Sequence, residues 1–243
     1  MEIAYKLYYW PLPFRGAFIQ LLLEHAGAEY QIASGEETSA FKDFDAATQG
    51  IPAMAPPFLK DCANGTYIAQ MPAIMMYLSE QLDYLPSGPY KRALVLKTLL
   101  DCNDVLSDLT NANGSKMWEH EQWISFRADR LKKWMRIFEA TGERNGLQAD
   151  AGFLLNSDQE NCADIAITAL FGTMCRCLPQ LHTDFKVTAP KIEALVARIE
   201  SDPIVRDFIK RQEAEYGQLY CGGQIERSIR DMLAQDEALS SER

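Results

Sequence analysis

Short strand-like runs and helical periodicities alternate at the start of the chain. Residues 3–9 and 30–33 are β-prone, and between them apolar positions recur at helical spacing over residues 15–27. Gly27 provides a natural end for this helix. The order strand, helix, strand predicts two parallel strands joined by the helix.

A hairpin and a further helix follow. Residues 58–61 and 66–69 are β-prone and are joined through Asn64-Gly65, a strong hairpin signal. Residues 72–82 have a helical pattern, with Pro72 in the first turn, where its missing N–H does no harm. The order β-α-β then β-β-α is thioredoxin-like, so residues 1–84 are predicted to form an α/β thioredoxin-like domain.

The strand signals stop after Pro89, and the pattern becomes helical throughout. Asn161-Cys-Ala-Asp164 resembles a capping box that opens the most apolar helix, which is expected at the centre of a bundle. We therefore predict an all-α C-terminal domain over residues 90–216. Residues 217–243 are polar and are expected to form a loosely ordered tail. The predicted helices cover residues 90 to about 111, 122 to about 140, 161–178, 190–200 and 203 to about 215.

Charge and composition narrow the functional classes. With 24 Lys and Arg against 34 Asp and Glu, the net charge of −10 disfavours nucleic-acid and anionic membrane partners. No apolar run approaches the roughly 20 residues of a membrane span, and the N-terminus lacks the features of a signal peptide. The six cysteines contain no Cys-x-x-Cys, and the three histidines lack metal-ligand spacing. These features predict a cytoplasmic protein with reduced thiols and no metal.

Four segments, in order along the chain, carry a family resemblance. Leu7-Tyr-Tyr-Trp-Pro11 together with Gln20-Leu-Leu-Leu-Glu24, then Pro57, then Gln70–Leu78, and then Asn161–Ala166 resemble tyrosine-type glutathione transferases of the mu, pi and sigma classes. The resemblance implies the glutathione transferase fold, a thioredoxin-like glutathione-binding domain followed by a helical domain. It also implies glutathione as co-substrate.

The resemblance assigns the catalytic role to Tyr9, at the end of the first strand. A glutathione thiol has a pKa of roughly 8.5, and a hydroxyl aimed at the sulfur stabilises the thiolate. Tyr8 is the alternative, because adjacent strand residues face opposite ways. Tyr9 is preferred because Trp10 then matches the family's following aromatic residue. Arg15 matches an arginine that contacts glutathione in some classes.

Two of the implied glutathione contacts depart from the family pattern. Gln70 and the helix that opens at Met71 are expected to bind the γ-glutamyl carboxylate, but Met71 replaces a serine hydroxyl whose hydrogen bond is worth about 1.5–3 kcal/mol. If Pro57 is the family's cis-proline, Pro56 occupies the position that pairs with the glutathione backbone, and its N–H is missing. If Pro56 is cis instead, Ala55 supplies that N–H.

Further implied residues lie in the second domain and between the domains. Asp108 resembles an acidic residue that reaches the partner's glutathione amine across a homodimer interface. A hydrophobic co-substrate pocket is expected between the domains, with walls formed by Leu12, Phe14, Met117 and Trp118.

The predicted function is a glutathione transferase that activates the glutathione thiol for attack on a small hydrophobic electrophile. Conjugation, isomerisation and peroxide reduction all use this thiolate and are not separated by the sequence. The alternative is a non-catalytic ligand-binding or protein-interaction module of the same fold, which the departures at Met71 and Pro56 favour. A cysteine-type thiol transferase has no support, because no cysteine lies near the start of the first helix.

Overall fold

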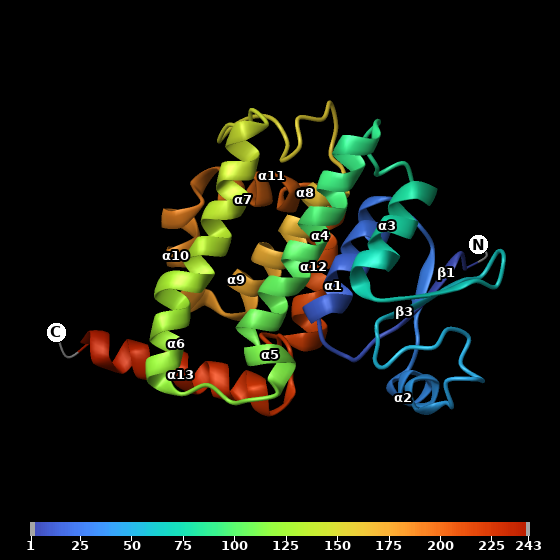
Figure 1. Cartoon of the computed structure of the whole chain (residues 1–243), viewed down its shortest axis with the longest axis horizontal. Helices are drawn as coiled ribbons and strands as arrows, with labels where there is room; N and C mark the ends of the chain where they lie inside the picture. Colours follow the sequence, from blue (N-terminus) through green and yellow to red (C-terminus); the bar gives the residue numbers. More distant parts are fainter. Residues whose placement is uncertain (1–2, 242–243) are drawn as a thin grey trace.

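The N-terminal part of the chain folds around a small mixed sheet. A computed structural model describes residues 3–241 and gives four strands in the order β2-β1-β3-β4 (Figure 1). Strand β1 pairs with β2 in parallel, and the β1–β3 and β3–β4 pairs are antiparallel. The strands are β1 (Tyr5–Tyr8), β2 (Tyr30–Ile32), β3 (Phe58–Asp61) and β4 (Tyr67–Ala69).

Helices lie against both faces of this sheet. Helices α1 (Phe14–His25) and α3 (Met71–Gln81) pack against the face that contains Leu7, in the main core of the molecule. Helix α2 (Gly35–Asp43) covers the other face, where Phe41 stacks on Tyr67. The thioredoxin-like order predicted from the sequence is present, with α2 in the segment between β2 and β3.

Over its described length the second domain contains helices and loops, and its longest non-helical segment covers residues 145–161. It begins with the long helix α4 (Pro89–Leu109), which follows α3 after a short linker. The helix predicted from residue 122 is continuous in direction but contains a π-helical segment, η1 (Phe126–Leu131). The remaining elements before the C-terminal segment are α5 (Asn111–Gly114), α6 (His120–Ser125), α7 (Lys132–Arg144), α8 (Cys162–Ile167), η2 (Thr168–Gly172), α9 (Thr173–Cys177), η3 (Pro179–Leu181), α10 (His182–Thr188), α11 (Pro190–Glu200) and α12 (Pro203–Tyr216).

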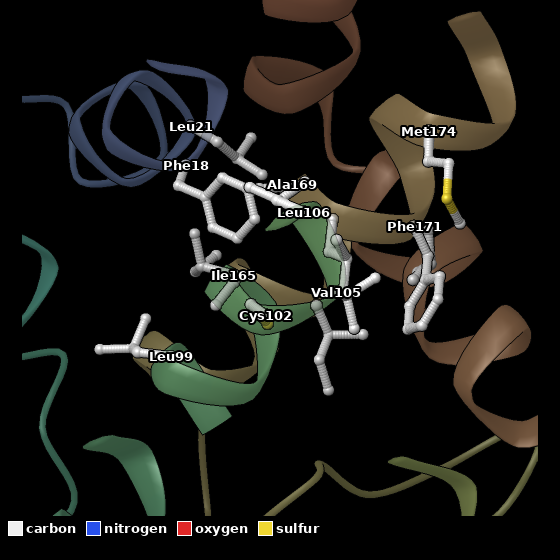
Figure 2. Close-up of a cluster of buried hydrophobic side chains, with 14 of the residues drawn as sticks. Phe18, Leu21, Leu99, Cys102, Val105, Leu106, Ile165, Ala169, Phe171 and Met174 are labelled. Carbon is white, nitrogen blue, oxygen red and sulfur yellow. The ribbon is translucent and has the colours of Figure 1, made fainter. Parts of the chain in front are cut away.

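The central helix α8–η2–α9 joins the two domains through one apolar core. Its predicted capping box is present, because Asn161 accepts from the Ala163 N–H and Asp164 accepts from the Asn161 N–H. Figure 2 shows side chains of α1, α4 and this central helix in one cluster. Burial of apolar surface across the junction stabilises the relative placement of the domains, at about 25 cal/mol per Å². The labelled members are Phe18, Leu21, Leu99, Cys102, Val105, Leu106, Ile165, Ala169, Phe171 and Met174.

The C-terminal residues correct one expectation. Instead of a loose tail, the chain forms helix α13 (Gly223–Ser241), which runs beneath α5 and α6 in Figure 1. Ile229, Met232 and Leu233 are buried, so a helical apolar face exists within a segment that is polar on average. Asp236 anchors its far half by accepting hydrogen bonds from Trp123 Nε1 (3.1 Å) and Arg127 Nη1 (2.9 Å).

Within residues 3–241, no single helix has the length and apolar character needed to cross a membrane. The bent pair Cys162–Cys177 and Pro179–Thr188, set at 116°, meets these criteria only when the two are counted together.

Candidate active site

Tyr9 lies where the first strand turns into α1. Side-chain alternation along β1 places Tyr9 with Leu7 on the α1 side of the sheet and Tyr8 on the α2 side. The Tyr9 ring packs directly on Gly16, where an added Cβ would come within 2.3 Å of the ring. Of the two tyrosines, only Tyr9 therefore faces the junction between the domains.

The hydroxyl group of Tyr9 is set up as a hydrogen-bond donor. The backbone N–H of Arg15 donates to its oxygen at 3.0 Å. Burial raises the pKa of Tyr9 above its ordinary value, while the Arg15 charge and the N–H groups of Arg15 and Gly16 act in the opposite direction. The phenol is therefore protonated at neutral pH, and because its oxygen already accepts a bond, its O–H remains for an acceptor such as a thiolate.

The Arg15 side chain is held by the second domain. Its Nε donates to Asn103 Oδ1 of α4 at 3.0 Å, and its Nη2 donates to Asn113 Oδ1 of α5 at 2.8 Å. The guanidinium lies over the Phe14 ring, 4.9 Å from the centroid. The predicted residues Tyr9 and Arg15 are thus brought together, and half-buried Trp10 is adjacent in the chain.

The start of α3 has the features of a carboxylate site. Gln70 adopts φ 74° and ψ 123°, and no side chain caps the helix that follows it. The first N–H groups of α3 are consequently left without a helical partner. The Met71 side chain is fully buried in the core, so at this position only the backbone is available to a ligand.

The Pro56–Pro57 peptide bond is cis, so Pro57 is the cis-proline. Both prolines are buried, and the Pro57 carbonyl accepts from the Gln70 N–H at 3.3 Å. This contact joins the cis-proline turn to the start of α3. Pro56 therefore stands at the position that precedes the cis-proline, with a carbonyl but no N–H for a ligand backbone.

Asp108 lies apart from this group. Its Oδ2 accepts from Arg130 Nε at 2.7 Å and from Trp134 Nε1 at 2.8 Å, so the carboxylate ties α4 to η1 and α7. Asn103 precedes Asp108 by five residues, which is about 140° around a helix. The implied contact of Asp108 with the partner's glutathione, across a homodimer interface, stays a prediction.

The predicted pocket walls are closed over by the C-terminal segment. The Phe14 ring meets Tyr220 edge-on at 5.4 Å, and a Cβ added to Gly222 would come within 3.0 Å of the Leu12 side chain. The Trp118 N–H donates to Ser228 Oγ of α13 at 2.8 Å. Leu12, Phe14 and Trp118 therefore lie against α13 and the residues before it, whereas Met117 is exposed.

A cavity adjoins the turn before α1. It has a volume of about 280 Å³ and is bounded by Pro13, by α9 and α12, and by the turn at Gly217. Thr173, Cys177 and Gln212 contribute to its walls. At this volume the cavity lies at the lower limit of small-ligand pockets.

Four residues of this site were missed by the sequence reasoning. Asn103 and Asn113 hold Arg15, and Tyr220 and Cys221 face it from the C-terminal segment. Burial raises the pKa of the Cys221 thiol to about 12, the opposite of a reactive thiolate. The Asn-Ala-Asn-Gly run at 111–114 was a turn signal, but nothing local in the sequence pointed to Arg15.

Comparison with known proteins identifies the family of the chain. The family model for the glutathione S-transferase C-terminal domain matches residues 94–232, more than half of the 243-residue chain. The chain therefore belongs to the glutathione S-transferase family. A comparison with curated protein sequences gave no match. Among residues 3–241, no group of three or more His, Cys, Asp or Glu side chains is arranged to hold a metal ion.

Solved structures with this fold cover most of the chain. The glutathione S-transferase of Ascaris lumbricoides is 19% identical, with 86% of this chain and 97% of that chain covered and a TM-score of 0.67. The monomeric Na-GST-3 of the hookworm Necator americanus is 20% identical, with coverages of 86% and 98% and a TM-score of 0.67. Prostaglandin synthase D of Nilaparvata lugens is 18% identical, with coverages of 86% and 98% and a TM-score of 0.66. At these identities the likeness establishes the fold.

Proposed function

We propose that this protein is a cytoplasmic glutathione transferase in which Tyr9 stabilises the glutathione thiolate for attack on a small hydrophobic electrophile. The observation that supports this most directly is the direction of the hydrogen bond at the Tyr9 hydroxyl. Its oxygen accepts the Arg15 N–H, which leaves its own proton for the glutathione sulfur. A charge-assisted bond of this kind is worth about 1.5–3 kcal/mol.

The charges of the other groups of glutathione indicate where they bind in the proposed site. The γ-glutamyl carboxylate is expected at the uncapped start of α3, beside Gln70, where free N–H groups and the helix dipole favour an anion. Pro56 offers only its carbonyl to the cysteinyl backbone, and Met71 offers only its N–H. Two standard contacts are thereby reduced, so we expect glutathione to bind more weakly than a complete site would bind it.

In the proposed reaction the thiolate sulfur forms a bond to the electrophilic atom of the co-substrate. A leaving group departs with the bonding electron pair, and the proton of the thiol goes to solvent. Conjugation of this kind is consistent with a role in detoxification. The cavity beside Pro13 and the apolar side chains of Leu12 and Phe14 are the proposed surroundings of the electrophile.

A homodimer is proposed from the exposed apolar side chains on α4. Tyr90 is 75% exposed, and Leu96 and Leu100 are also exposed on this helix. Met54, in the loop before β3, is similarly exposed. Leu96 and Leu100 are four residues apart and so are neighbours on one face of α4, and exposed apolar patches mark interaction surfaces.

A second candidate function is a non-catalytic binding module of the same family. It is favoured by the covering of the site, because Tyr9 is only 4% exposed and the segment at Tyr220–Gly222 lies over Phe14 and Leu12. Such a protein would bind a ligand or partner without turnover.

Titration of reduced glutathione into the protein, with the ultraviolet thiolate band as a second readout, separates the candidates. The transferase should bind glutathione and form thiolate at neutral pH. Tyr9→Phe should raise the thiol pKa by about one to two units, the equivalent of the lost hydrogen bond. Tyr8→Phe is the matched control, because Tyr8 lies on the α2 side of the sheet, and it should leave the thiol pKa unchanged.

Failure to bind would contradict the proposal. Glutathione at about 10 mM is about a hundredfold above a Kd of about 0.1 mM and should stabilise the protein by about 2.7 kcal/mol. If neither heat of binding nor a shift in thermal stability is seen at that concentration, the non-catalytic module is the correct reading. If glutathione binds and forms thiolate but a chlorodinitrobenzene is not turned over, that compound is excluded as the electrophile. The thiolate mechanism itself would not be contradicted.

A further inference from the structure

The Arg15 guanidinium is a half-buried positive charge without an acidic partner in the part of the chain that the structure describes. Its hydrogen-bond acceptors are two neutral amides, Asn103 and Asn113. The titratable groups that face it are Tyr9, Tyr220 and Cys221, and all three are neutral at physiological pH because burial raises the pKa of each. A cation that is partly withdrawn from water is commonly paired with a carboxylate, and here two neutral amides take that place, so the positive charge is left unneutralised.

An unfavourable backbone conformation brings one of these amides into place. Four successive residues, from Asn111 to Gly114, have positive φ angles of 45°, 57°, 57° and 77°. This is a left-handed turn, which residues other than glycine adopt reluctantly, asparagine less so than alanine. It is closed by the Gly114 N–H, which donates to the Thr110 carbonyl at 2.6 Å.

The turn has a definite result for the site. It directs Asn113 back from the end of α4 to Arg15, which lies 98 residues earlier in the chain. It also places Gly114 under Ile225 of α13, where a Cβ would be in van der Waals contact. Unfavourable conformations persist where the surroundings hold them, and they concentrate at functional sites.

We propose that Asn103 and Asn113 are positioning residues that hold the Arg15 guanidinium beside Tyr9 with its charge unneutralised, so that the charge acts on the thiolate of bound glutathione. This inference rests on the proposed function. Amide oxygens suit the task because they accept hydrogen bonds from a guanidinium and carry no formal charge. A carboxylate in either position would hold the side chain equally well and cancel its effect on the sulfur.

The test replaces each asparagine by its near-isosteric acid. Asn103→Asp and Asn113→Asp are each expected to raise the midpoint of thermal unfolding without ligand, because a half-buried cation gains a partner, and the rise should be smaller at exposed Asn113. In the same variants the apparent pKa of the bound glutathione thiol, followed by its ultraviolet band, should rise by about one unit. The thiolate fraction at neutral pH should then fall about tenfold.

Two further variants keep the test decisive. Asn113→Gly retains a residue that tolerates a positive φ and removes the acceptor without adding charge, so the thiol pKa should rise by less than in Asn113→Asp. Asn156→Asp is the matched control, because Asn156 also has a positive φ (51°) but lies in an exposed loop before α8. It adds the same charge and should leave the thiol pKa unchanged.

The outcomes distinguish this inference from the function on which it rests. If the wild type does not bind glutathione, both are overturned. If it binds glutathione and forms thiolate, but both Asp variants titrate like wild type, the positioning role alone is overturned. A thermal midpoint that falls in both Asp variants is the opposite of what an unpaired cation predicts, and would overturn the inference as well.

Discussion

At the scale of single residues, the contact between Tyr9 and Gly16 determines where the hydroxyl can lie. Glycine at the first turn of α1 lets the tyrosine ring rest on the helix backbone, 2.3 Å from where a Cβ would be. The same close approach puts the hydroxyl within reach of the Arg15 N–H. Helix propensity alone would favour alanine at position 16, so the glycine serves the placement of Tyr9.

Gly16→Ala should therefore displace the ring. We expect a loss of about 1–3 kcal/mol in unfolding free energy from overpacking, and a fall of about a hundredfold in kcat/KM for a displacement near 1 Å. Gly35→Ala is the control, because no atom lies within 4 Å of the Cβ it would add. Equal activity of the two variants would show that the Tyr9 ring can move without consequence.

The hydrogen bonds of Asp164 lead to a prediction about stability. The buried carboxylate accepts from the Leu154 N–H at 2.8 Å and from the Asn161 N–H at 3.0 Å. Asp164→Asn leaves one of these donors facing an amide NH₂, so we expect the unfolding free energy to fall by about 1–3 kcal/mol. Denaturant unfolding of both proteins measures the difference.

The pH dependence of that difference has a defined sign. Burial raises the pKa of Asp164 to about 7, although the two N–H donors oppose the shift. Between pH about 4 and about 7 the folded state then holds a proton that the unfolded state releases, so stability falls as the pH rises, with a slope of about one proton. The Asn variant should lack this component. Parallel stability curves for the two proteins across this range would contradict the assignment.

At the scale of elements, α13 is held at both ends. Near its start, Glu226 Oε2 accepts from the backbone N–H groups of Tyr220, Cys221 and Gly222. Near its end, Asp236 accepts from Trp123 and Arg127. The segment that covers Leu12 and Phe14 is thus fixed by bonds made within and beyond the helix.

Asp236→Ala should loosen the far attachment. We expect faster amide hydrogen exchange along residues 223–239 and a loss of about 1–3 kcal/mol in unfolding free energy, since Trp123 and Arg127 each lose an acceptor. Asp231→Ala is the matched control, because Asp231 is exposed on the same helix. If exchange in α13 is equal in the two variants, Asp236 is not what holds the helix.

Predictability from sequence differs between these elements. The β1–α1–β2 unit and the hairpin could be predicted because Gly27 and Asn64-Gly65 are local signals. Strand alternation also predicts that Tyr8 and Tyr9 face opposite ways, whereas the choice of Tyr9 came from the family resemblance at Trp10. Helix α13 was missed because its apolar positions, Ile225, Ile229, Met232 and Leu233, are diluted by charged neighbours, although their spacing is helical.

Contacts between residues far apart in the sequence could not be predicted from such local signals. Arg15 meets Asn113 only because the chain reverses through a left-handed turn at the end of α4, and an Asn-Gly dipeptide signals a turn without giving its direction in space. The bonds of Asp108 to Arg130 and Trp134 are likewise long-range contacts that no local signal indicated, and its implied contact with the partner's glutathione stays a prediction. Short motifs specify local geometry better than they specify partners.

At the scale of the whole molecule, the exposed face of α4 predicts self-association. Sedimentation should give a mass of twice 27.5 kDa for a homodimer. The double variant Leu96→Glu/Leu100→Glu should shift the protein to the monomer, because it places charges in an apolar contact. Val187→Glu is the control, since Val187 is exposed on α10, outside this face. If the wild type is monomeric at all concentrations, the proposed dimer is contradicted. The hookworm Na-GST-3 is an example of a monomeric structure with this fold.

The covering of Leu12 and Phe14 by residues 220–222 also has a consequence for how the protein is made. Chains fold from the N-terminus during translation, so the sheet, Tyr9 and α1 exist before the last helix leaves the ribosome. Until then the apolar turn before α1 is exposed to water and to other nascent chains. A chain truncated after α12 would therefore form the complete sheet but leave the apolar site exposed. We expect such a chain to aggregate or to bind chaperones.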